Sequence, residues 1–180
     1  METASVVCAG MLVLFFGFTA QRYSVFFQDR LSFWLSAVRT SPHAQLAHLN
    51  LGAMYYLDQE YAQAESEFNR AAELEPNARL IHNNQGLIYM QKRMFPEAER
   101  EFDLEINLNP GYASAYYNKG VLYSNLGRKD LAVAFWKKTL DMDKDYIDAM
   151  RNLALYYAGT RDATRYNYYA EQLKLRGFRI

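Results

Sequence analysis

The sequence predicts an all-α protein, a solenoid of stacked helix pairs that follows an apolar N-terminal helix. The main observation is a period of 34 residues, in which a tyrosine, a glycine, an alanine and a proline recur in step. A fixed period of this length indicates an array of one repeated supersecondary unit. The recurring residues are Tyr55, Tyr89, Tyr123 and Tyr157; Gly52, Gly86 and Gly120; Ala64, Ala98 and Ala132; and Pro42, Pro76 and Pro110.

The seventeen residues 4–20 carry no charge, and apolar residues resume at 23–27 after a single arginine, Arg22. As a helix, 4–20 would be about 25 Å long, slightly short of a hydrocarbon core of roughly 30 Å. A helix over 4–27 would cross the core if the Arg22 head reached back to the interface, so we predict a single-pass membrane anchor there. Two alternatives are less favoured. A cleaved signal peptide would carry basic residues where Glu2 stands, and a buried helix of a soluble protein would need a large apolar face elsewhere in the chain to receive it.

The segment 28–42 is predicted to be a half-repeat that caps the array. Counted back from the first full repeat, Trp34, Ala37 and Pro42 fall at the positions that end a repeat. Terminal units of an array are often atypical, because one of their faces has no neighbouring repeat.

Numbered from Gln45 as position 1, full repeats are predicted over 45–78, 79–112 and 113–146, and a degenerate repeat over 147–177. Glycine at position 8 and alanine at position 20 mark the close crossing of the two helices, since a larger side chain would push them apart. Aromatic residues at positions 11 and 24 fill the space around the crossing. Proline at position 32 ends the second helix in the first two repeats.

Several residues depart from the pattern or mark helix ends. Position 27 carries Ala71, then Glu105, then Thr139, where a small residue is expected. Gly127 suits a left-handed residue at the end of a first helix. Asp162 is predicted to cap the last helix.

This pattern resembles the tetratricopeptide repeat, a 34-residue two-helix motif. The resemblance implies a right-handed α-solenoid that binds a protein or an extended peptide in a concave groove, which the first helices line. Side-chain amides at position 6 could pair with the backbone of a bound peptide, or could only bridge neighbouring helices. The predicted partner-binding residues are Leu49, Asn50, Asn83, Asn84, Leu87, Tyr117, Asn118, Val121 and Arg151.

One binding mode of the family is not expected here. Its chaperone-binding members hold a terminal carboxylate with lysines at position 5 of one repeat and position 2 of a later one, and an asparagine at position 9. This chain has Leu49, Ser114 and Ala53 in those places.

The junction between the anchor and the array resembles the C-terminal tail of O-mannosyltransferase-like multi-spanning membrane proteins. The matching residues are 12–18, Arg22, Trp34 and the run 49–52. This resemblance implies an alternative function, a regulatory or substrate-presenting tail of a membrane glycosyltransferase, with its repeats in the periplasm or lumen. Arg22 lies near the C-terminal end of the predicted span, Arg30 and Arg39 follow it, and no lysine or arginine precedes it, which favours the cytoplasm. The side of the membrane stays open.

No catalytic site, metal site or cofactor site is predicted, so an enzyme is not expected. His48 and His82 share position 4 of adjacent repeats, but no third ligand has a matching spacing, which favours ordinary packing over a metal pair. Twenty basic and twenty acidic residues give a net charge of zero, which argues against nucleic-acid binding. Self-association is a further possibility if the open ends of the array stack.

Overall fold

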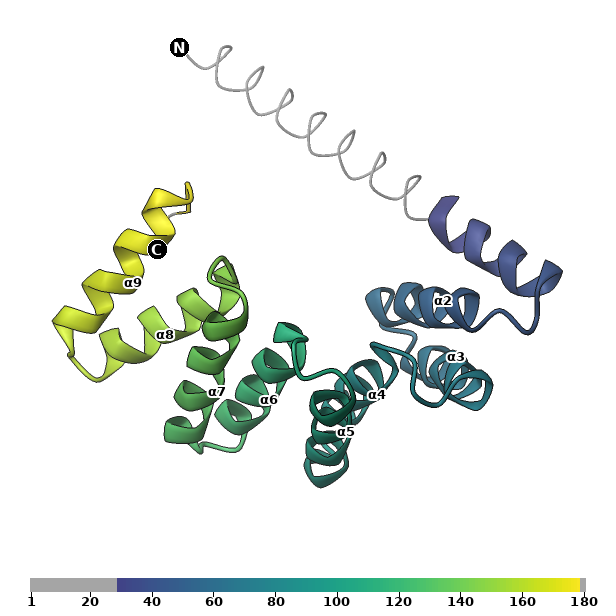
Figure 1. The fold of residues 1–180 in the computed structure, drawn as a ribbon, viewed down its shortest axis with the longest axis horizontal. Coiled ribbons are helices and arrows are strands. Elements are labelled where there is room, and N and C mark those ends of the chain that lie inside the picture. Colours follow the sequence, from purple (N-terminus) through teal and green to yellow (C-terminus); the bar gives the residue numbers. More distant parts are fainter. Residues whose placement is uncertain (1–28, 179–180) are drawn as a thin grey trace, which may run out of the picture. The chain divides into compact units, whose positions relative to one another are not determined.

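The computed structural model describes residues 29–178, and these residues form helices joined by short turns, with no strand among them (Figure 1). The prediction of an all-α solenoid of helix pairs is confirmed. The chain divides into two compact units, Met1–Leu74 and Glu75–Ile180, which are described separately below. Within the described range, no helix is long and apolar enough to cross a membrane. The anchor predicted over 4–27 lies outside the described residues.

The first unit contains a helix over 29–40, then α2 (Gln45–Leu57) and α3 (Tyr61–Leu74). Helices α2 and α3 pack against each other as one hairpin. A Cβ atom added at Gly52 would lie 2.6 Å from Cε1 of Phe68, closer than carbon atoms can approach. The same Cβ would lie 3.2 Å from the carbonyl oxygen of Ala64, so the close crossing predicted at positions 8 and 20 is present, with the aromatic residue of position 24 beside it.

The second unit is built of three hairpins, each a first helix followed by a second helix. Neighbouring hairpins pack through α5 on α6, α7 on α8 and α4 on α6. The helices are α4 (Ile81–Gln91), α5 (Phe95–Leu108), α6 (Ala113–Asn125), α7 (Lys129–Met142), α8 (Ile147–Gly159) and α9 (Ala163–Leu175).

The core of the second unit is shared between consecutive hairpins. Ala98 and Phe102 of α5 form a buried cluster with Leu122 of the next hairpin. Trp136 of α7 lies in a second cluster with Leu153 of α8. Each hairpin therefore completes its core with residues of the next, as expected for an array in which a single unit cannot bury its apolar face alone.

The turn between the two helices of each repeat contains one left-handed residue at position 15. Gly127 has φ +72°, which confirms its predicted conformation. The equivalent residues Gln59, Arg93 and Arg161 have φ values of 63°, 58° and 58° although they carry side chains. An L-residue in this conformation costs roughly 1–2 kcal/mol, so three of the four turns are strained.

Helix α4 starts later than the repeat numbering predicts. Helices α2, α6 and α8 begin at position 1, but α4 begins at Ile81, which is position 3. The preceding residue, Leu80, has φ +77°, and its side chain caps no helical amide. The physical reason lies in α5, where a buried carboxylate holds this helix start, as described below.

Candidate peptide-binding surface

The first helices of the second unit place most of the predicted partner-binding residues on neighbouring elements. Helix α4 packs against α6, and the ring of Tyr117 of α6 packs at a tilt against that of Tyr146, the residue before α8, with ring centroids 4.9 Å apart. The predicted residues that are partly exposed on these helices are Asn84 and Leu87 of α4, Tyr117, Asn118 and Val121 of α6, and Arg151 of α8. We call this set the first-helix surface.

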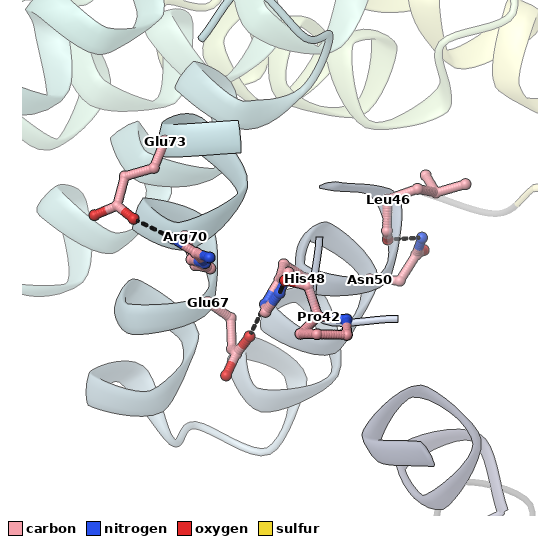
Figure 2. Close-up of polar contacts among 7 residues, drawn as sticks. All are labelled: Pro42, Leu46, His48, Asn50, Glu67, Arg70 and Glu73. Carbon is pink, nitrogen blue, oxygen red and sulfur yellow. Dashed lines mark hydrogen bonds and ion pairs between the residues drawn. The ribbon is translucent and has the colours of Figure 1, made fainter. Parts of the chain in front are cut away.

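Two predicted residues are not on a surface. Leu49 is 6% exposed and Asn83 is 3% exposed, so neither side chain can contact a partner in this conformation. Both stand at position 5, whose side chain turns inward in these two repeats. Asn50, in the first unit, is partly exposed, and its amide donates to the Leu46 carbonyl at 2.7 Å (Figure 2).

The asparagines at position 6 form a column whose side chains bridge neighbouring first helices. The Asn118 amide donates to Oδ1 of Asn83 at 2.8 Å, and the Asn152 amide donates to the Tyr117 hydroxyl at 3.3 Å. In both contacts a position 6 side chain reaches position 5 of the preceding repeat. An asparagine side chain offers two N–H donors and an acceptor with two lone pairs, so one such bridge uses only part of its capacity.

A pocket of about 330 Å³ opens where α6, α7 and α8 meet. We call it the α6–α8 pocket. Lys129 is the one charged side chain in its lining, and Leu155 at its rim is 56% exposed. The Trp136 ring also lines it, and the buried indole Nε1 has no hydrogen-bond partner in the described part of the chain. The remaining lining residues are Ser124, Ala132, Asn152, Tyr156, Gly159 and Thr160.

The tyrosines beside this surface are neutral hydrogen-bonding groups. Burial raises the pKa of Tyr117, and it likewise raises the pKa of Tyr146. The Tyr146 hydroxyl donates to Oγ of Ser114 at 3.3 Å. Since both phenols keep their protons well above neutral pH, they add polar contacts to the surface without adding charge.

A second pocket, of about 560 Å³, lies between the C-terminal half of α7 and α9, and its lining differs in character. Its lining carries charges of both signs, with Lys137, Lys144 and Arg176 against Asp141. Arg176 is already engaged, because its guanidinium pairs with Asp145 at 2.6 Å and donates to the Gln172 carbonyl at 2.9 Å. This mixed lining favours no single class of ligand.

Each of the two histidines at position 4 is paired with a glutamate of its own repeat. His48 Nδ1 lies 2.6 Å from Oε2 of Glu67, and its Nε2 lies 3.1 Å from the Pro42 carbonyl oxygen (Figure 2). His82 Nδ1 lies 2.8 Å from Oε2 of Glu101. Residues 29–178 contain no cluster of three or more potential metal ligands.

Sequence reasoning missed the second-helix contribution to the α6–α8 pocket. The predicted groove was assigned to first helices alone, whereas Lys129 and Trp136 come from α7. The signal was present in the sequence, because Trp136 stands where the two preceding repeats have phenylalanine.

Comparison with known protein families identifies the repeats. Tetratricopeptide-repeat families match residues 34–79, 58–113 and 113–146, which together cover more than half of the chain. No curated protein matches by sequence. The resemblance to O-mannosyltransferase-like tails stays a hypothesis, and residues 12–18 and Arg22, which carry much of it, lie outside the described residues.

Three solved structures illustrate the shared fold. The crystal structure of MamA has 21% sequence identity and a TM-score of 0.70, covering 87% of this chain and 94% of that chain. PilF of Pseudomonas aeruginosa has 17% identity and a TM-score of 0.67, over 77% of this chain and 63% of that chain. The first tetratricopeptide-repeat domain of Spaghetti (RPAP3), bound to the HSP90 peptide SRMEEVD, has 20% identity and a TM-score of 0.59, over 65% of this chain and 93% of that chain.

The recurring glycine–ring crossings, the shared hairpin cores and the matches over residues 34–146 lead to one conclusion. The chain belongs to the tetratricopeptide-repeat family, and its repeats form a protein–protein interaction module.

Proposed function

We propose that the protein is a binding module without enzymatic activity, and that it holds an extended protein segment on the first-helix surface of its second unit. The observation that carries this proposal is the α6–α8 pocket, whose rim residue Leu155 is 56% exposed. Leu155 shares position 9 with Leu87 and Val121, so an apolar row follows the three first helices.

The chemistry of this surface suits an extended backbone. Asn84 and Asn118 stand at position 6, beside the apolar row, and Asn152 continues this column into the pocket. Amides can both donate to a peptide carbonyl and accept from a peptide N–H. Apolar side chains of the partner would lie along the row, and alternate side chains of an extended segment could enter the pocket.

Site-specific photocrosslinking of the full-length protein in native membranes tests the proposal. A crosslinker in place of Leu155 should capture a partner. A crosslinker in place of Leu104 should not, because this leucine is also exposed (43%) but lies on a second helix, α5. Equal capture from both positions would refute the assignment.

A double substitution gives an independent test. Asn84→Asp with Leu87→Asp places two charges on the surface and should abolish capture, while helicity measured by circular dichroism stays unchanged. Both residues are partly exposed, but Leu87 also packs against the buried cluster that contains Phe102, so circular dichroism must confirm that the variant is folded. Unaltered capture by a folded variant would place the binding surface elsewhere.

We further propose that the N-terminal segment ties this module to a membrane, on a side that stays open. The support is the uncharged run over 4–20, together with the aromatic pair that follows it. Phe33 is 62% exposed and packs edge-on against Trp34, with centroids 4.9 Å apart. Aromatic rings of this kind are enriched at membrane interfaces. Carbonate extraction of membranes tests the anchor, since a peripheral protein would be released.

Self-association through the last helix is a second candidate. Tyr168, Leu175 and Phe178 are 60%, 69% and 40% exposed, and α9 is the last helix that the structure describes. A second copy could cover these side chains. Light scattering of the purified protein should then show a mass that falls when Leu175 is changed to Glu, whereas a constant monomer mass would exclude this candidate.

A further inference from the structure

The second unit begins with residues 75–80, and ionisable side chains of α4 and α5 hold this segment in place. It contains Pro76, and it ends at Leu80 with φ +77°, directly before the delayed start of α4. Such a conformation is costly for leucine, so contacts elsewhere must hold it. Those contacts come from α5 and from the first turn of α4.

Glu105 of α5 supplies the first fastening. Its side chain is 0% exposed. Oε1 accepts the Leu80 N–H at 3.1 Å and the Asn109 amide at 2.7 Å, and Oε2 accepts the Asn83 N–H at 3.2 Å. A buried carboxylate needs such donors, and α4 needs an acceptor because it has no capping side chain of its own.

His82 of α4 supplies the second fastening. Its Nδ1 lies 2.8 Å from Oε2 of Glu101, and the ring is also hydrogen-bonded to the Pro76 backbone, which offers only a carbonyl. Both partners are therefore acceptors. A neutral imidazole donates from one nitrogen only, whereas the imidazolium donates from both. The geometry is complete only when the ring is doubly protonated.

The surroundings of His82 favour the charged ring. The hydrogen bond with Glu101 raises the pKa of His82, burial opposes this, and the charges of Glu101 and Glu105 add to the rise. Both glutamates belong to α5. On α6, the other helix packed on α4, Lys119 forms an ion pair with Asp103.

We propose that residues 75–80 form a protonation-controlled latch at the start of the second unit, closed when His82 bridges Glu101 and the Pro76 carbonyl. When the ring loses its second proton, the Pro76 carbonyl loses its donor. The turn is then released from α4, and the strained Leu80 has only Glu105 to hold it.

The residue at position 4 also contacts a proline carbonyl in the first and third repeats, and in the third repeat this residue is not a histidine. His48 makes the same pair of contacts, to Glu67 and to the Pro42 carbonyl (Figure 2). In the third repeat, position 4 is Tyr116, whose hydroxyl donates to the Pro110 carbonyl at 3.0 Å. Phe135 stands there at the position that Glu101 occupies in the second repeat. A tyrosine keeps its proton through the range in which histidine titrates.

Hydrogen exchange of individual amides in the full-length protein tests the latch. The Leu80 and Asn83 amides, which donate to Glu105, report on the start of α4. After correction for intrinsic exchange, their protection factors should fall at least about fivefold between about pH 6 and about pH 8.5. The Ala115 amide, which donates to the Tyr112 carbonyl in the third repeat, is the internal control and should stay constant.

The chain offers a matched variant. Replacing His82→Tyr together with Glu101→Phe transplants the pair of the third repeat into the second. This variant should keep the protection of Leu80 and Asn83 at both pH values. Protection in the wild type that changes less than about twofold would overturn the proposal, and so would a pH response that survives in the variant.

A measurement on the unmodified protein stands even if the variant does not fold. The ¹⁵N chemical shifts of the His82 ring distinguish the doubly protonated form from either neutral tautomer. Both nitrogens should be protonated at about pH 6.5, where an unperturbed histidine is half neutral. A neutral ring at that pH would overturn the proposal.

Discussion

The second and third repeats share one geometry and fasten it with different chemistry. Each crosses its helices at a glycine, Gly86 or Gly120, which lies under an aromatic ring of its own second helix. At position 27, the second repeat buries the carboxylate of Glu105, whereas the third buries the hydroxyl of Thr139, which donates to the Phe135 carbonyl of its own helix at 2.9 Å.

The difference extends to the turns. At position 4, the second repeat uses a histidine where the third uses a tyrosine. At position 15, the second has Arg93 with φ 58° and the third has Gly127 with φ +72°. The same backbone geometry is therefore compatible with either charged or neutral side chains at these positions. Substitution at position 27 should therefore cost more in the second repeat than in the third, and three further experiments test the crossing, the contact between the repeats and the turn.

The largest expected effect is at position 27. Glu105→Ala leaves the Leu80 and Asn83 amides without an acceptor and should lower the free energy of unfolding by about 3 kcal/mol. Thr139→Ala should cost about 1 kcal/mol, because its hydroxyl serves only a carbonyl of the same helix. Urea denaturation of both variants measures the difference. Equal costs would mean that Glu105 does not hold the start of α4.

The next effect is at the helix crossing. A Cβ at position 86 would lie 2.6 Å from Cε1 of Phe102, so Gly86→Ala should destabilise by about 2 kcal/mol through overpacking. Gly159→Ala is the matched control, since a Cβ there meets nothing within 4 Å. That change should stabilise α8 by about 0.5 kcal/mol. Thermal unfolding separates the two outcomes, and a neutral Gly86→Ala would contradict the close crossing.

The third effect concerns the contact between the two repeats. Burial and a hydrogen bond to Glu99 of the second repeat raise the pKa of Tyr123 to about 12. Because the folded-state pKa exceeds the ordinary value of 10.0, this group stabilises the fold below pH 10 and loses its contribution as pH rises through about 12.

Phenolate absorbance against pH measures this directly. Tyr123→Phe should remove one tyrosine that ionises above the ordinary range, and the free energy of unfolding should then fall less steeply at high pH. A titration curve that is unchanged by this substitution would show that Tyr123 ionises like an exposed tyrosine.

The smallest expected effect is at the turn. Arg93→Gly relieves a left-handed arginine and should stabilise the protein by about 1 kcal/mol. Gly127→Ala makes the opposite change in the third repeat and should destabilise by a similar amount. A shift in the urea midpoint reports both, and a destabilising Arg93→Gly would mean that the arginine side chain holds the turn.

The sequence predicts the helix pairs well, because their determinants repeat. Gly86 and Phe102 have the same spacing as Gly120 and Trp136, so the sequence pattern of the helix crossing occurs three times in the chain. The turn residue Gly127 was predictable from its chemistry, but Arg93 and Arg161 were not. These residues adopt the left-handed conformation because the hairpin imposes it, and no local preference signals it.

The site was less predictable, because it depends on the direction in which individual side chains turn. Asn83 and Asn84 are adjacent in sequence, yet only Asn83 is buried, where it accepts from Asn118 of the next repeat. Glu105 stands out as a departure at position 27, but its partner Leu80 lies 25 residues earlier. The pairing follows from how α5 lies against the start of α4, which the periodicity does not specify.

The place of Trp136 in the lining of the α6–α8 pocket has a practical consequence. The chain contains two tryptophans, and the other is Trp34. A Trp34→Phe variant would leave a single indole emitter at the proposed contact site. The protein then reports on its own occupancy through intrinsic fluorescence, so unlabelled peptide libraries could be screened against it optically.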